Sequence, residues 1–204
     1  MRKSISKGVR LLSAVIIPTV MFRPSTAAAH LVTTGMGPVY DGIGHLLLTP
    51  EDLVPALAVA LYAGLRGSAP SRYALFFLPL AWLLGGLAGL PANGPAIFPL
   101  PALSFLVLGV LIAADLRLPT GIFTVLVVVV GLMHGFFNGI ALKEGPGGLG
   151  LIGIMSALFV LVALVASFVI SLKPPWTRIV VRVAGSWVTA MGLLMIGWFM
   201  RGQG

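Results

Sequence analysis

Two polar side chains near the amino-terminal third have a spacing that could bind a metal ion. Asp41 and His45 are four residues apart, so a helix would place both on one face. A carboxylate and an imidazole together suit a borderline divalent cation such as Ni²⁺, Co²⁺ or Zn²⁺. The alternative is that Asp41 only orients the His45 ring through a hydrogen bond.

Two acids, Glu51 and Asp52, follow at what the sequence predicts to be a helix start. Thr49 is a typical cap, Pro50 suits the first helical position, and acids favour the first turn. The favoured interpretation is that both acids stabilise this start and stay in contact with water. The pattern also divides residues 43–48 from 53–65. The break is either a broken helix at membrane depth or a periplasmic turn before a short helix.

A second polar pair, His134 and Asn138, lies in the middle of a long apolar segment and is again four residues apart. An imidazole and an amide in hydrocarbon are unfavourable without partners, so they indicate either a helix-to-helix hydrogen bond or a polar pathway. Gly131, Gly135 and Gly139 repeat at the same spacing and would let another helix approach closely. We therefore expect both polar side chains to face the bundle interior. The row of Gly85, Gly86 and Gly89 indicates packing.

The composition shows which kind of element must position these residues. Of 204 residues, 58% are hydrophobic and 9% are charged, against about 25% charged in a soluble domain. Cysteine is absent, which excludes disulfides and thiolate metal sites. The sequence has no nucleotide-binding or hydrolase motif and no basic patch with interleaved aromatic residues. An enzyme and a nucleic-acid partner are therefore not expected, nor is a tightly bound cofactor.

The amino terminus has the three parts of a cleavable secretory signal. Four basic residues precede a short apolar stretch, 11–22, which is too short to span a bilayer, and small residues follow it. Cleavage after Ala29 would make His30 the first residue of the mature chain. Its free α-amine and imidazole could then chelate a metal, although an ordinary histidine at a frayed end is the simpler interpretation.

The rest of the chain predicts one all-α domain, 30–204, that follows the signal peptide 1–29. It is a polytopic membrane protein, a compact bundle of about six transmembrane helices joined by short turns with Pro and Gly. The predicted segments are 53–65, 73–90, 97–114, 121–142, 149–172 and 179–200.

Charge asymmetry predicts the orientation in a bacterial inner membrane. With the mature amino terminus in the periplasm, the inner segments carry six basic residues and the outer segments two, in agreement with the positive-inside rule. Asp115 lies beside Arg117 at the inner interface and is expected to form a loop pair with it. The six inner bases are Arg66, Arg72, Arg117, Lys173, Arg178 and Arg182, and the two outer ones are Lys143 and Arg201.

Two short motifs resemble the HupE/UreJ family of small membrane proteins. Residues 42–47, Gly-Ile-Gly-His-Leu-Leu, resemble the core of the family's His-Pro-x-x-Gly-x-Asp-His motif before the first helix. Residues 131–139, with the 116–119 lead-in, resemble its later His-Gly-x-x-His-Gly helix. By position, His45 and His134 match family histidines. The family's aspartate is Gly44 here, its leading histidine is Gly37, and its second later histidine is Asn138. Residues 49–52 resemble an insertion.

The resemblance implies a permease or facilitator that moves a divalent transition metal from periplasm to cytoplasm. Nickel is the first expectation, and cobalt, copper or zinc are alternatives for this transient ion. A membrane accessory or assembly subunit for a membrane or periplasmic metalloenzyme is the second possible function. The expected partners are the lipid bilayer and the metal ion. The residues expected to handle the ion are His45, His134, Asp41, Asn138, His30 and Glu51, of which only the first two are carried over from the family.

Overall fold

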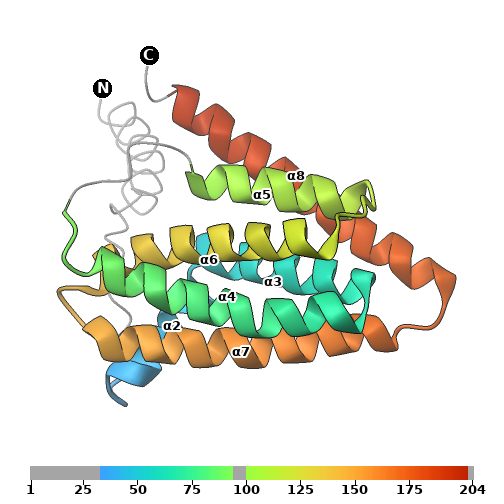
Figure 1. Ribbon diagram of the computed structural model, residues 1–204. Coiled ribbons are helices and arrows are strands. Elements are labelled where there is room, and N and C mark those ends of the chain that lie inside the picture. The colour runs from blue at the N-terminus through green and yellow to red at the C-terminus, as the bar shows by residue number, and fades with distance from the viewer. Residues whose placement is uncertain (1–32, 94–99, 202–204) are drawn as a thin grey trace, which may run out of the picture. The chain divides into compact units, whose positions relative to one another are not determined.

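Every regular element that the structure describes is an α-helix, which confirms the predicted all-α fold class. The computed structural model describes residues 33–93 and 100–201, so the predicted signal peptide and His30 lie outside the described residues. Seven helices occupy these ranges within one unit, Leu31–Gly204 (Figure 1). They are α2 (Pro38–Leu48), α3 (Pro50–Arg66), α4 (Ser68–Gly89), α5 (Leu100–Ala113), α6 (Thr120–Leu142), α7 (Gly147–Ser171) and α8 (Pro175–Arg201).

Four of these helices, α4, α6, α7 and α8, are long and apolar enough to cross a membrane. The pair α2 and α3 would make a fifth span if it counts as one broken crossing. Each of the six predicted apolar segments coincides with a helix. The shortest, α5, has 14 residues and begins directly after an undescribed stretch. Six crossings therefore remain a prediction, whereas a helical multi-pass membrane protein is supported.

Helix α3 lies at the centre of the bundle and contacts every other helix that the structure describes. In Figure 1 it runs inside the bundle, with α5 and α8 on one side and α7 on the other. Small residues make this position possible, because Ala56, Ala60 and Ala63 are fully buried and let neighbouring helices approach. Any polar side chain on the inner faces of α3 is therefore surrounded by protein.

The glycine rows of α4 and α6 form one close helix–helix contact, as both rows predicted. A Cβ atom at Gly135 would collide with the backbone carbonyl of Trp82, and one at Gly139 with the carbonyl of Gly86. From the other side, a Cβ atom at Gly85 would collide with the carbonyl of Leu132. The two backbones therefore touch along this seam, which holds α6 against α4.

The chain breaks between α2 and α3, and the two axes differ by 77°. Pro50 is the first residue of α3, as predicted, and Glu51 and Asp52 fall in its first turn. Thr49 is the N-cap residue of α3, as predicted, although its side chain makes no capping hydrogen bond. Helix α2 packs against α7, where Cβ atoms at Gly42 and Gly153 would collide with the carbonyls of Gly150 and Val39.

Candidate functional site

The centre of the site is Asp52, a carboxylate buried at the break between α2 and α3. Its exposed fraction is 5%, although the favoured expectation was an acid in contact with water. The correction has a geometric reason. Asp52 is on the inner face of the first turn of α3, and the neighbouring helices close over it. Glu51, one position earlier, is on the outer face and remains exposed, as expected.

Two residues of α6 hold the Asp52 carboxylate. The Oδ1 atom of Asp52 is 2.9 Å from Nδ1 of His134. The amide Nδ2 of Asn138 donates to the other oxygen, Oδ2, at 2.7 Å. Both α6 side chains are almost fully buried, at 1% and 3% exposed. A buried carboxylate is unfavourable unless it is paired and hydrogen-bonded, and these two contacts supply that pairing.

A second ring of contacts orients the two α6 side chains. Ser104 of α5 lies 2.9 Å from Nε2 of His134 through its Oγ. The indole nitrogen of Trp82 on α4 donates to Oδ1 of Asn138 at 3.0 Å. The Trp82 ring also stacks on His134, with centroids 5.2 Å apart. The imidazole is thus fixed on both ring nitrogens and on one face.

The proton positions follow from the donors and acceptors present. An ionised carboxylate only accepts hydrogen bonds, so Nδ1 of His134 carries a hydrogen when it faces Asp52. Its Nε2 then faces the Ser104 hydroxyl, whose single hydrogen is shared between this nitrogen and the Pro101 carbonyl oxygen, 2.7 Å from Oγ. Because Asn138 accepts from Trp82 and donates to Asp52, its amide orientation is also determined. The network runs from α4 through α6 to α3 and α5.

His45 is the third titratable side chain of this group. Its Nε2 lies 3.9 Å from Oδ2 of Asp52, which is ion-pair range but longer than a hydrogen bond. It reaches Asp52 because α2 turns by 77° at Thr49. The structure therefore brings His45, His134 and Asn138 together around one carboxylate. Three helices, α2, α3 and α6, and the break are needed to assemble this arrangement.

The other sequence-predicted site residues lie elsewhere. Asp41 is on α2, but its Oδ1 accepts hydrogen bonds from the backbone nitrogen of Thr34 at 2.6 Å and from its hydroxyl at 2.7 Å. Glu51 lines a cavity of about 490 Å³ between α3, α5 and α8, together with Pro101, Met195 and Trp198. His30 lies outside the described residues.

The site could bind a cation only after local rearrangement. Within residues 33–93 and 100–201, no three metal-ligating side chains are close enough together to hold an ion as they stand. What the geometry does provide is one carboxylate and two imidazoles in a largely buried polar cluster. Such a cluster can exchange hydrogen bonds for bonds to a metal. The lone pairs of an imidazole nitrogen and of carboxylate oxygens can either accept a hydrogen bond or bind a metal ion.

Sequence reasoning missed three members of the network. Asp52 was assigned to a wet helix start, and Ser104 and Trp82 were not considered. Ser104 did carry a signal, because it is the only hydroxyl side chain in the apolar stretch 97–118. Trp82 carried none, since three further tryptophans lie in apolar or interfacial positions.

A cluster of basic residues and one acid lies where α3 and α5 end and α8 begins, away from the Asp52 network. Asp115, in the left-handed backbone conformation with φ of 53°, contacts Arg66 at the end of α3 and Arg178 on α8. The expected pairing with Arg117 was wrong. The cause is the turn at Asp115, which directs its carboxylate toward α3 and α8, whereas Arg117 lines a neighbouring cavity.

Comparison with known proteins agrees with the sequence motifs. A family model described as HupE / UreJ protein matches residues 18–195. Protein HupE of Rhizobium leguminosarum bv. viciae is 24% identical over 197 residues, which cover 94% of this chain and 97% of that protein. No match was found among solved structures.

Proposed function

This protein belongs to the HupE/UreJ family, and on that premise we propose that it is a membrane permease or facilitator for a divalent transition metal. Nickel is the first candidate, and the proposed direction is from periplasm to cytoplasm. The observation that carries the proposal is the buried carboxylate of Asp52, which pairs with His134 and lies 3.9 Å from His45 at a helix break. Ionisable groups inside a membrane bundle are costly and typically serve a pathway.

The chemistry of the cluster suits a borderline cation. Neutral imidazole binds Ni²⁺, Co²⁺, Cu²⁺ and Zn²⁺, and a single carboxylate lowers the net charge of the ion without holding it too tightly. In this mechanism the incoming ion binds Nδ1 of His134 and Oδ1 of Asp52 in place of their hydrogen bond, and the hydrogen of Nδ1 moves to Nε2, where the Ser104 oxygen accepts it. His45 turns toward the same ion. A permeation site must bind the ion weakly enough to release it again, so two imidazoles and one acid suffice.

The proposed entry route passes Glu51. The cavity that Glu51 lines also contains Pro101, whose carbonyl oxygen is 2.7 Å from the Ser104 hydroxyl. Ser104 in turn contacts His134, so the cavity ends next to the network. Asp41 and His30 remain proposed capture groups at the outer face. Intact-mass measurement tests the latter, because a protein that retains residues 1–29 could not present a free amine at His30.

Uptake of radioactive metal tests the proposal. Cells that express the wild type, His45→Ala or His134→Ala at matched levels would be given labelled nickel, cobalt, copper or zinc. We expect the wild type to accumulate at least one of these ions and both variants to lose most of that uptake. Glu144→Gln is the matched control, because this acid is exposed and outside the network.

Equal uptake by the wild type and both histidine variants would remove the transport proposal. A wild type that does not exceed cells without the protein would have the same consequence. Either result would favour the second candidate, a non-transporting accessory or assembly subunit for a metalloenzyme. Co-purification with such an enzyme would then be the relevant measurement.

A further inference from the structure

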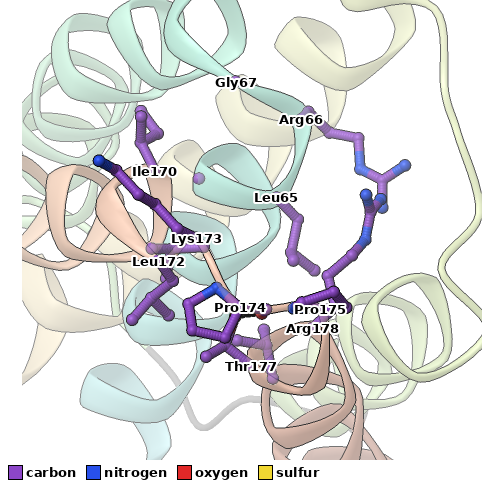
Figure 2. A pocket seen from close by; sticks show the side chains of 13 residues that line it. Leu65, Arg66, Gly67, Ile170, Leu172, Lys173, Pro174, Pro175, Thr177 and Arg178 are labelled. Carbon is purple, nitrogen blue, oxygen red and sulfur yellow. Dashed lines mark hydrogen bonds between the residues drawn. The ribbon is translucent and has the colours of Figure 1, made fainter.

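A cationic pocket lies at the end of the helices where α3 finishes and α7 leads into α8. Its volume is about 470 Å³, and the charged residues that line it are Arg66, Lys173 and Arg178. Figure 2 shows the guanidinium groups of Arg66 and Arg178 next to each other, with Lys173 across the pocket. None of the lining residues is acidic. The pocket therefore has a strong excess of positive charge.

Arg66 has hydrogen-bonding capacity that the protein leaves unused. Its side chain is only 8% exposed, and its guanidinium contacts Asp115 and lies 5.2 Å from the centre of the Tyr62 ring. The buried Nε atom has no hydrogen-bond partner among the described residues. A buried donor without a partner costs about 1–3 kcal/mol.

Asp115 does not neutralise the surroundings of the pocket. It is the one acid in contact with Arg66 and Arg178 among the described residues, whereas Arg117 lines an adjoining cavity of about 330 Å³ with the same two arginines. The two adjoining cavities are thus lined by four cations, and one carboxylate contacts two of them. This excess attracts anions, and two neighbouring guanidinium groups match the oxygen atoms of a phosphate in particular.

Part of the pocket lining is apolar. Val169, Ile170 and Val181 belong to it, and Thr177, whose hydroxyl donates to the Pro174 carbonyl, also lines the pocket. An amphipathic ligand with an anionic head and a hydrocarbon tail fits this combination of surfaces. Basic pockets between helices at a membrane boundary bind anionic lipid headgroups by this arrangement.

We propose that this pocket binds the phosphate group of an anionic phospholipid headgroup. Arg178 and Lys173 reach the phosphate oxygens, and Arg66 adds positive charge to the pocket lining. The bound lipid would connect the ends of α3, α7 and α8. This proposal is independent of metal transport and of which membrane face carries the pocket.

Lipid titration of the purified full-length protein tests this. Native mass spectrometry and thermal unfolding in detergent would be followed while phosphatidylglycerol, phosphatidylcholine or sodium phosphate is added. The variants are Lys173→Gln and Arg178→Gln, which alter exposed side chains, so the fold should tolerate both. Arg72→Gln is the matched control, because Arg72 is exposed and does not line the pocket.

We expect phosphatidylglycerol to bind and raise the unfolding temperature, and phosphatidylcholine to bind at least about tenfold more weakly. Each pocket variant should bind phosphatidylglycerol about tenfold more weakly than the wild type, which corresponds to the loss of one charge-assisted hydrogen bond. Arg72→Gln should bind as the wild type does. Equal binding of the two lipids, or unchanged binding in both pocket variants, would overturn the proposal. Stabilisation by sodium phosphate equal to that by the lipid would overturn the assignment to a lipid.

Discussion

The Oδ1 atom of Asp52 lies 2.9 Å from Nδ1 of His134, although 82 positions separate the two residues in the chain. This contact joins the first turn of α3 to the middle of α6. It also explains how the protein can bury a carboxylate, since the imidazole and the amide of Asn138 replace the water that Asp52 would lose. The same contact would have to open for a cation to bind.

Asp52→Asn should damage both stability and transport. Asparagine removes the charge and one of the two acceptor oxygens, so either a donor–donor clash forms or the hydrogen of His134 must move from Nδ1 to Nε2. Loss of one partner of a buried pair costs about 3–5 kcal/mol. Thermal unfolding in detergent and metal uptake at matched expression would measure the two effects. An Asp52→Asn variant as stable and as active as Glu144→Gln would contradict the central role of this carboxylate.

Gly135→Ala should open the seam between α4 and α6. The added Cβ atom would collide with the carbonyl of Trp82, so the helices must separate at a cost of about 1–3 kcal/mol. The shift would also move Trp82 away from His134. Gly121→Ala on the same helix is the control, because a Cβ atom there meets open space. The prediction fails if the two variants unfold at the same temperature.

Tyr62→Phe should destabilise the connection between α5 and α6. The fully buried Tyr62 hydroxyl donates to the Leu116 carbonyl at 2.9 Å and accepts from the Leu118 nitrogen at 3.0 Å. Phenylalanine leaves both backbone groups without this partner, with an expected loss of about 1–3 kcal/mol. Tyr73→Phe, at a residue that is 45% exposed, should change the unfolding temperature little. Equal effects of the two changes would show that the buried hydroxyl contributes nothing.

Trp82 should report metal binding by fluorescence. Its ring stacks on His134, so an ion held by that imidazole would lie close enough to quench it. In a protein with Trp176, Trp187 and Trp198 changed to Phe, we expect Ni²⁺ to quench the emission and Mg²⁺ to leave it unchanged, because Mg²⁺ prefers oxygen ligands. His134→Ala in the same background should abolish the response. Quenching that persists in that variant would place the ion elsewhere.

Local patterns in the sequence predicted much of the fold. Hydropathy located the apolar helices, Pro50 and the acids after it located the start of α3, and the spacing of Gly131, Gly135 and Gly139 predicted a close helix contact. Each of these signals depends on residues a few positions apart. They act through helix geometry and the transfer of side chains into hydrocarbon, which the sequence alone specifies.

The sequence could equally identify His45, His134 and Asn138 as polar residues that need partners, because they lie in apolar surroundings. Which partners they have was decided by the tertiary structure. Asp52 is buried and Glu51 exposed only because α3 turns one of two adjacent acids toward α6, and Ser104 and Trp82 join because α5 and α4 pack beside that helix. Contacts across such distances depend on the order and rotation of packed helices, a property of the whole bundle that no local pattern records.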